Sequence, residues 1–359
     1  MRSTRLPVSA VLVTVLGVMG TVLGVGRLTV SEASEPATEV TAEGSSAPSA
    51  TVPTAARSGA AVSDRRALAE GQVTEASMAD PFVVRAEGRY WLYATNTHGA
   101  NVPVLSSTDG AHWTDEGDAL PVLPEGALAG KSLVWAPSVL ALDGRYVMYV
   151  TVFDEATDEP CIAVATADRP DGPFATGEDW RLECGRGAGG VIDASPVQDG
   201  DGSWWVVFKN EGSAAVGNAL WSARLAADGL STVGSSTPLL WADQDWEHGV
   251  VEGPSMVALE GGYLLVYSAA VWDDSAYSTG LAWCTTVTGP CTKLADGPVL
   301  ASGWGGDGPG GGEVFTDASG HHWVVYHQRD PEVAGPGQSR RPYLISLADL
   351  CDLPSCSEA

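Results

Sequence analysis

One pattern of hydrophobic and polar positions is repeated five times between residues 80 and 329. Each copy has a short apolar run, a turn that contains glycine, and a second run in which apolar and polar side chains alternate. The copies are DPFVVRAEGRYWLYATN from Asp80, APSVLALDGRYVMYVTV from Ala136, SPVQDGDGSWWVVFKNE from Ser195, GPSMVALEGGYLLVYSA from Gly253 and EVFTDASGHHWVVYHQR from Glu313. Alternation with a period of two is typical of strands, so each copy predicts a β-hairpin.

The copies are evenly spaced. Their second residues, Pro81, Pro137, Pro196, Pro254 and Val314, are 56, 59, 58 and 60 residues apart. The residue nine positions later is aromatic in every copy: Tyr90, Tyr146, Trp205, Tyr263 and Trp323. Three copies continue into a third strand, and the remaining length leaves room for a fourth. Five such sheets bury their faces when stacked around an axis, so we predict an all-β fold, a five-bladed β-propeller of four-stranded antiparallel blades.

Other architectures fit the pattern less well. A β-sandwich also gives many strands and turns, but it does not give a fivefold period. An α/β barrel needs helices, and no stretch of 11 to 18 residues in this domain keeps the apolar spacing of a helix.

The N-terminal segment predicts export. Two arginines precede a charge-free stretch from Val8 to Gly26, which suits a signal peptide within residues 1–33, cleaved after Ala33, or an uncleaved membrane anchor. Residues 34–70 are rich in Ser, Thr, Ala, Pro and Glu and contain no aromatic residue, so we predict a disordered linker. The propeller would then occupy residues 71–359, outside the cell or on the outer face of its membrane.

Charge restricts the partners. The chain has 45 acidic and 19 basic residues, and its net charge of -26 repels phosphate backbones and anionic lipid. We therefore expect no nucleic-acid partner, and membrane contact only if the N-terminal segment is uncleaved. A neutral or cationic ligand is compatible with this charge.

The six cysteines all lie beyond the linker. An even number of cysteines in an exported chain predicts disulfides, although six cysteines allow 15 connectivities. Local pairing would join Cys161 to Cys184, Cys284 to Cys291 and Cys351 to Cys356. A zinc site is the alternative, but there is no CxxC motif or histidine cluster to support it.

Carboxylates stand at the head of three repeats. Asp80, Asp193 and Glu252 lie one to three residues before the repeat proline. Each alone suits ordinary turn chemistry. In a propeller, however, the first strand of every blade is innermost, so the three acids would meet at one mouth of the channel, where like charges force at least one pKa upward. A protonated acid beside an ionised base is what glycoside hydrolysis requires, and calcium binding is the competing use.

The motifs resemble those of glycoside hydrolase family 43, five-bladed enzymes that act on arabinan and xylan. The likeness covers residues 76–346 and rests on ADPFV, VWAPSV, IDASPV, VEGPSM and TDASGHHWVVYH in this order. It implies an inverting hydrolase of pentose polysaccharides or oligosaccharides. Asp80 would be the general base, Glu252 the general acid, and Asp193 the carboxylate that orients the acid and keeps its pKa high.

The fifth repeat departs from the family pattern. Members commonly carry a histidine after Gly-Pro-Gly, tied to a central ion or water cluster, whereas this chain has Gly311 there and Glu313 two places on. We predict no required cofactor and no metal ligands; a structural ion in the channel is left as an alternative that lacks its usual ligand. Glu313 either adds a fourth carboxylate to the pocket or is an idle strand-end acid.

Further side chains are candidates for sugar binding. A flat aromatic ring packs well against a sugar, and the candidates are Phe82, Trp135, Phe153 and Trp272. His327 either lines the channel as a substrate contact or is a core histidine. Arg329, Arg340 and Arg341 follow the last hairpin, where family members often direct an arginine toward the sugar, although a solvated loop is the simpler fate for each.

Two functions compete with this hydrolase. A non-catalytic carbohydrate-binding propeller would keep the aromatic residues but would not need an acid and a base. A sialidase is suggested by SSTDGAHW, which is similar to an Asp-box turn, but this segment occurs only once. The three carboxylates favour the enzyme of arabinan or xylan.

Overall fold

The computed structural model describes residues 68–97, 99–128, 133–185, 187–303, 306–329, 339–353 and 356. The predicted signal or anchor, residues 1–33, and all but the last three residues of the predicted linker, residues 34–70, lie outside this part of the chain. Within it, no helix is long and apolar enough to span a membrane.

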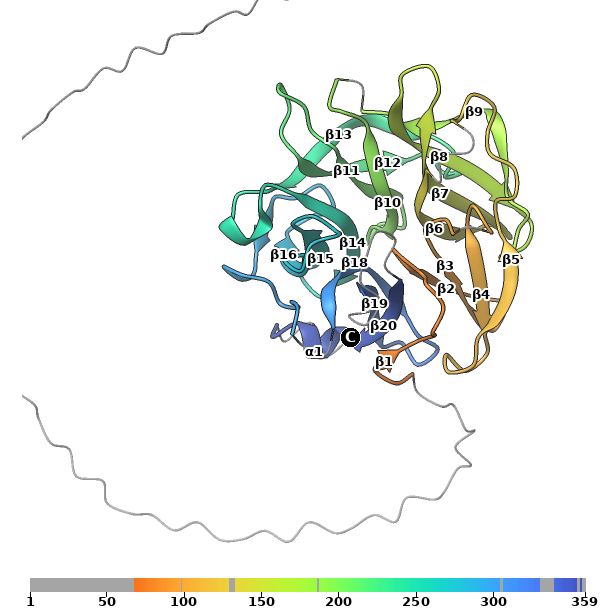
Figure 1. Cartoon of the computed structure of the whole chain (residues 1–359). Coiled ribbons are helices and arrows are strands. Elements are labelled where there is room, and N and C mark those ends of the chain that lie inside the picture. The colour runs from red at the N-terminus through yellow and green to blue at the C-terminus, as the bar shows by residue number, and fades with distance from the viewer. Residues whose placement is uncertain are drawn as a thin grey trace, which may run out of the picture. The chain divides into compact units, whose positions relative to one another are not determined.

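The described chain forms five sheets of four antiparallel strands arranged in a ring (Figure 1), which confirms the predicted five-bladed propeller. From the innermost strand outward, the first three blades are β2 (Phe82–Ala86), β3 (Arg89–Tyr93), β4 (Pro103–Ser107) and β5 (Thr114–Asp118); β6 (Val134–Leu142), β7 (Arg145–Asp154), β8 (Glu159–Ala167) and β9 (Ala175–Glu183); β10 (Val191–Gln198), β11 (Trp204–Asn210), β12 (Ala219–Leu225) and β13 (Thr232–Trp241). The fourth is β14 (Val251–Leu259), β15 (Gly262–Ala269), β16 (Ser278–Cys284) and β17 (Cys291–Lys293).

The fifth blade closes the ring with a strand from the other end of the domain. It consists of β18 (Asp307–Thr316), β19 (His322–Arg329), β20 (Arg340–Ser346) and β1 (Gly71–Gln72). The short β1 pairs antiparallel with β20, with Gly71 opposite Leu344. A 3-10 turn, Asp245–Glu247, and a short helix α1, Leu347–Leu350, are the helical elements of the described chain. The first and last blades are thus locked together by main-chain hydrogen bonds.

Each pair of neighbouring blades encloses its own hydrophobic cluster. In the second blade, Tyr146 and Met148 face the first blade, whereas Val147 and Tyr149 face the third. This is the period-two alternation seen in the sequence, since successive side chains of a strand point to opposite faces. Burial on both faces explains why the inner strands carry few charged residues.

The register differs from the sequence alignment in the third and fifth blades. Their first hairpins have five-residue turns, 199–203 and 317–321, whereas the other three have two-residue turns. Trp204 therefore takes the place that Tyr90 has in the first blade, and Trp205 packs toward the fourth blade instead. Trp323 is displaced in the same way. A one-residue slip moves a side chain to the opposite face, so the aromatic position shared by the five copies does not have the same structural role in all five blades.

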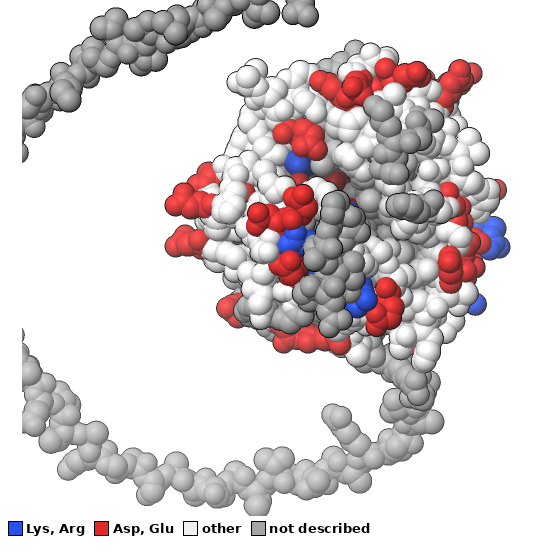
Figure 2. All heavy atoms as spheres, in the orientation of Figure 1, with Lys and Arg blue, Asp and Glu red and all other residues white. Residues whose placement is uncertain are grey.

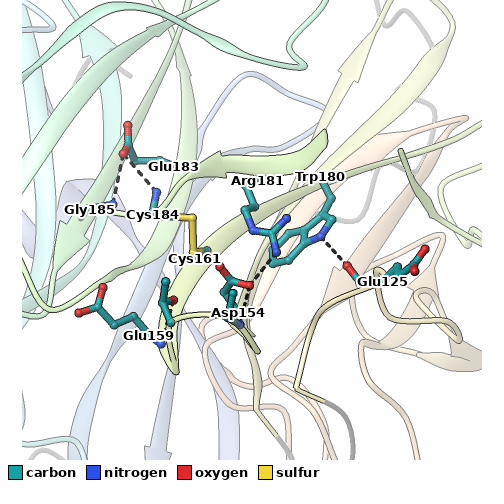
Figure 3. Close-up of a disulfide and its surroundings, with 11 residues drawn as sticks. Glu125, Asp154, Glu159, Cys161, Trp180, Arg181, Glu183, Cys184 and Gly185 are labelled. Atoms are coloured by element: carbon teal, nitrogen blue, oxygen red, sulfur yellow. Dashed lines mark hydrogen bonds and ion pairs between the residues drawn. A yellow bond between two sulfur atoms is a disulfide. The ribbon is translucent and has the colours of Figure 1, made fainter. Parts of the chain in front are cut away.

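Three disulfides are present with the predicted local pairing. Cys161 of β8 bonds Cys184, Cys284 of β16 bonds Cys291, and Cys351 bonds Cys356. Figure 3 shows the first of these beside an ion pair between Arg181 and Asp154, 2.6 Å. No described cysteine is free for a metal.

Candidate active site

The same backbone feature stands at the head of every blade. One residue there adopts a positive φ: 48° at Asp80, 42° at Ala136, 60° at Asp193, 54° at Gly253 and 60° at Gly311. In the second to fifth blades the inner strand also shifts its register at this point. Bulges of this kind redirect side chains and are common beside active sites. Glycine adopts this conformation freely and Asp tolerates it better than most residues, whereas Ala136 is strained. Asp80 and Asp193 therefore occupy structurally equivalent positions, and Glu252 stands one residue before its own.

The preceding blade fixes each of these residues. The N–H at every positive-φ position donates to a side chain of that blade; the donors and acceptors are Asp80 to His327, Ala136 to Thr95, Asp193 to Thr151, Gly253 to Asp193 and Gly311 to Ser268. Four of the acceptors lie at the end of the second strand. The heads of the five blades are thus held by a ring of hydrogen bonds around the axis.

A pocket of about 790 Å³ opens at the meeting point of the heads. Asp80, Asp193 and Glu252 all line it, so the structure brings the three predicted carboxylates together. The volume lies in the range of about 300–1,000 Å³ that is usual for small-molecule sites. On the face shown in Figure 2, acidic side chains are prominent and basic ones are few, which suits a neutral ligand better than an anion.

Asp80 carries a negative charge that the pocket stabilises. It accepts hydrogen bonds from the Thr95 hydroxyl at 2.5 Å and from Arg340 Nη1 at 3.2 Å. Burial alone would raise the pKa of Asp80, but Arg340, His327 and Thr95 together lower it below its ordinary value. His327 is itself uncharged near neutrality, because burial lowers its pKa to about 3, so Arg340 is the cation that acts on Asp80 there.

His327 supports Asp80 from below and does not line the pocket. Its side chain is 0% exposed, and Nδ1 accepts the Asp80 N–H at 3.0 Å. The prediction that His327 contacts substrate is therefore not supported by its position; it is a core histidine. With Nδ1 as an acceptor, the ring hydrogen resides on Nε2, which is buried without a partner in the described structure.

His327 does not replace the histidine that the family pattern has at Gly311. It offers a cation no free lone pair, because Nδ1 accepts the Asp80 N–H and Nε2 carries the hydrogen. The described residues contain no group of three His, Cys, Asp or Glu side chains able to hold a metal. Gly311, at the family's histidine position, has no space for a larger side chain. An added Cβ would lie 2.6 Å from His327 Nδ1 and 2.9 Å from Asp80 Oδ1.

Asp193 and Glu252 form the second part of the site. Asp193 Oδ2 accepts the N–H of Gly253 at 2.9 Å, which ties the third blade to the residue beside Glu252. Burial and then the charge of Glu252 raise the pKa of Asp193 to about 8, although Lys209 acts in the opposite direction. Asp193 therefore holds a proton near neutrality, directly beside Glu252.

Glu252 is held at both oxygens. Lys209 Nζ lies 2.8 Å from Oε2, and the Tyr277 hydroxyl donates to Oε1 at 2.9 Å. The Tyr277 ring in turn stacks on His327, with centroids 5.9 Å apart. Glu252 and Asp80 are thereby fixed by two stacked rings.

Glu313 lines the pocket. Its Oε2 accepts the Ser195 hydroxyl at 2.8 Å. Burial raises the pKa of Glu313 to about 8, so the side chain is mostly protonated near neutrality. Of the two fates left open by the sequence, a fourth carboxyl group in the pocket is the one observed.

The aromatic candidates divide into two groups. Trp135 and Trp272 line the pocket, and Trp272 lies beneath the Arg340 guanidinium at 4.6 Å. Phe153 does not line the pocket; its ring packs edge-on against Trp135, with the ring centroids 5.1 Å apart. Phe82 is 7% exposed in the core between the first two blades, so its assignment to substrate binding was wrong. It was misassigned because the residue after the repeat proline turns away from the channel.

The three candidate arginines have different partners. Arg340 reaches Asp80 and the pocket, whereas Arg329 pairs with Asp307 at 2.7 Å and Arg341 pairs with Glu75 at 3.2 Å. Arg329 is buried rather than solvated.

Sequence reasoning missed three functional neighbours: Thr95, Lys209 and Tyr277. Thr95 and Lys209 end the second strand of their blades, in the same position as Thr151, Ser268 and His327. A comparison of these strand ends could have found them, since Lys209 is the one lysine in the series. Tyr277 lies in a loop without a repeat pattern and gave no signal.

Comparison with known proteins agrees with this geometry. Residues 72–346 match the sequence profile of the glycosyl hydrolases family 43. The chain belongs to this family. As predicted, it is a glycoside hydrolase with the family's propeller fold.

The relatives of this family 43 chain have varied names. A β-D-galactofuranosidase of Aspergillus niger is 26% identical over 70% of this chain and 74% of its own length. A probable arabinan endo-1,5-α-L-arabinosidase A of Emericella nidulans is 27% identical over 76% and 88%. Among solved structures, a thermostable family-43 glycoside hydrolase has a TM-score of 0.68 and 27% identity, over 76% of this chain and 89% of its own.

Proposed function

We propose that the protein is an exported hydrolase that cleaves O-glycosidic bonds of arabinan- or xylan-type pentose polysaccharides or oligosaccharides with inversion. The observation that carries this proposal is the meeting of Asp80, Asp193 and Glu252 in one pocket, where they have different charged neighbours. Asp80 is held ionised beside Arg340, whereas Asp193, which holds the residue next to Glu252, is protonated near neutrality. Inverting hydrolysis needs an ionised base and a protonated acid at the same time.

Asp80 acts as the general base in this mechanism. It takes a proton from a water molecule as the water oxygen forms a bond to the anomeric carbon. Glu252 acts as the general acid and gives its proton to the glycosidic oxygen as the bond from that oxygen to the anomeric carbon breaks. Each carboxyl group must then exchange a proton with solvent before the next cycle. Asp193 positions the acid by holding Gly253.

Trp135 and Trp272 supply the sugar-binding surfaces in this proposal. Both line the pocket, and a flat ring against the apolar face of a furanose or pyranose is a favourable contact. The pocket volume of about 790 Å³ supports binding of an oligosaccharide rather than of one ring. The names of the relatives support furanosides first, because an arabinosidase and a galactofuranosidase are among them.

Export rests on three features. The N-terminal residues have the pattern of a signal or anchor, the net charge is -26, and three disulfides join all six cysteines. Disulfides persist in oxidising compartments outside the cytosol. The proposed location is extracellular, or the outer face of the membrane if the N-terminal segment is retained.

The test is hydrolysis followed by proton NMR of the first sugar released. We expect cleavage of at least one of linear arabinan, xylan, nitrophenyl arabinofuranoside, nitrophenyl xyloside and nitrophenyl galactofuranoside, and a product of inverted anomeric configuration. Retention would refute the proposed mechanism. Binding of these sugars without hydrolysis would refute the proposal and support the non-catalytic carbohydrate-binding propeller.

A further inference from the structure

Lys209 bridges two carboxylates at the edge of the pocket. Its side chain is 4% exposed, and Nζ lies 2.8 Å from Glu252 and 3.2 Å from Glu211. Glu211 is 36% exposed and lines the pocket. A single buried cation thus contacts both the proposed acid and a carboxylate that the proposed mechanism does not use.

The contact with Lys209 is a difficulty for a general acid. A cation beside a carboxyl group favours its ionised form, whereas a general acid must be protonated when it acts. Lys209 keeps its positive charge near neutrality. Burial would lower its pKa, but the charges of Glu252, Glu211 and Asp193 outweigh burial and raise it above the ordinary value.

We propose that Glu211 is a positioning residue that acts as the counter-ion of Lys209, so that Glu252 keeps the proton it donates to the leaving group. This inference rests on the proposed function, because it assumes that Glu252 is the acid. Paired with Glu211, Lys209 donates a hydrogen bond to Glu252 and holds its orientation without a net positive charge.

The backbone around Asn210 fixes this arrangement. Asn210 stands between Lys209 and Glu211 and is 2% exposed. Its Nδ2 donates to the Gly217 carbonyl at 3.0 Å, and its Oδ1 accepts from the Trp221 indole at 2.8 Å. The Glu211 N–H donates to the Gly190 carbonyl at 3.1 Å. Lys209 is therefore directed into the pocket from a rigid strand end, with Glu211 beside it.

The other charged and titratable groups around Glu252 do not replace Glu211. Asp193 on β10 and Glu313 on β18 have raised pKa values, which leaves them mostly protonated near neutrality. Asp80 is paired with Arg340. Of the remaining neighbours, Tyr277 is uncharged because burial raises its pKa well above the usual value, and His327 is uncharged too. Glu211, 3.2 Å from Lys209 Nζ, is thus the carboxylate placed to act as its counter-ion.

The experiment compares wild-type protein with Glu211→Gln. Two measurements are made: the pH dependence of kcat/KM on a natural glycoside, and direct ¹³C NMR titration of the Glu252 carboxyl, assigned with Glu252→Gln. Removing the Glu211 charge leaves Lys209 to stabilise ionised Glu252. The alkaline limb and the NMR titration should both move to lower pH by about half to one unit. Activity at pH 8 should then fall about 3- to 10-fold, with little loss at pH 5.

Matched variants separate this role from a structural one. Glu178→Gln removes an equal charge from the exposed strand β9, and we expect both curves to stay in place. Glu211→Asp keeps the charge, so both curves should stay close to those of the wild type. In a Lys209→Met background, Glu211→Gln should shift the curves much less, because the effect passes through Lys209.

The outcomes distinguish this inference from the proposed function. If Glu211→Gln leaves both curves unchanged while the wild type hydrolyses glycosides, the counter-ion role is wrong and the hydrolase stands. If the wild type hydrolyses none of the substrates, the proposed function fails, and the NMR titration still decides the role of Glu211. An equal loss of activity at all pH values, without an NMR shift, would also overturn the inference.

Discussion

The N–H of Asp80 donates to Nδ1 of His327 at 3.0 Å, across the junction where the last blade meets the first. This hydrogen bond joins the proposed base to a histidine that is distant in sequence. The His327 ring also stacks on Tyr277, which holds Glu252. Closure of the propeller is therefore a condition for assembling the site, and the packing around His327 should control activity.

Gly311→Ala tests this packing. The added Cβ would lie 2.6 Å from His327 Nδ1 and 2.9 Å from Asp80 Oδ1, at a φ of 60° that disfavours alanine. Displacing a catalytic group by about 1 Å costs roughly 100-fold, so we expect a loss of at least that size in kcat/KM. Gly297→Ala is the control, because its Cβ meets nothing within 4 Å. Full activity of Gly311→Ala would show that Asp80 is not fixed in this way.

Arg340→Gln should move the acidic limb of the pH profile. Arg340 lowers the pKa of Asp80, so its removal raises that pKa and the base becomes ionised only at higher pH. We expect the acidic limb to move to higher pH by about one unit. KM should also rise, since Arg340 lies over the Trp272 ring. Arg224→Gln, an exposed change on β12, is the control, and an acidic limb that stays in place in Arg340→Gln would contradict the role of Arg340.

Glu313→Gln should reduce the pH dependence of stability. The pKa of Glu313 is raised to about 8, so its contribution is fully present below the unfolded-state pKa near 4 and is lost as pH rises through 8. Wild-type Tm should fall between pH 5 and pH 9. Glutamine imitates the protonated form, so the Tm of the variant should fall less over this pH range. Each kcal/mol of pH-dependent stability that is removed should reduce the fall by about 3 °C. Parallel Tm curves in differential scanning calorimetry would contradict this prediction.

The disulfides should differ in their contribution to the free energy of unfolding. Cys161 and Cys184 are 23 residues apart, whereas Cys284 and Cys291 are 7 apart. Loop-closure entropy gives about 3 kcal/mol for the first and about 2 kcal/mol for the second. Replacing the first pair by alanine should therefore lower the free energy of unfolding more, as measured by urea denaturation. A larger loss for the second pair would be evidence against the entropic explanation.

Local patterns in the sequence predicted the blades, the disulfide pairing and the meeting of three carboxylates. Strand alternation and glycine turns depend on neighbouring residues, so they are legible without a structure. The strand β1 was not predicted, because two residues carry no pattern. The different packing of Trp205 and Trp323 was not predicted either, because it follows from the longer turns of their blades.

Contacts between blades could not be predicted from one repeat at a time. Lys209 reaches Glu252 from the neighbouring blade, and Arg340 reaches Asp80 across the ring closure. Phe82 and His327 lie at repeat positions near the channel, yet their side chains are buried away from the pocket. The side to which each side chain turns depends on contacts with the neighbouring blade, which one repeat does not contain.

The most direct test of the central claim compares Glu252→Gln and Asp80→Asn on two substrates. One is a natural glycoside, and the other is a nitrophenyl glycoside whose leaving group needs no proton. If Glu252 is the acid and Asp80 the base, Glu252→Gln nearly abolishes hydrolysis of the natural glycoside but keeps much more activity on the nitrophenyl substrate, whereas Asp80→Asn loses both. Equal losses of the two variants on both substrates would contradict the assignment of acid and base.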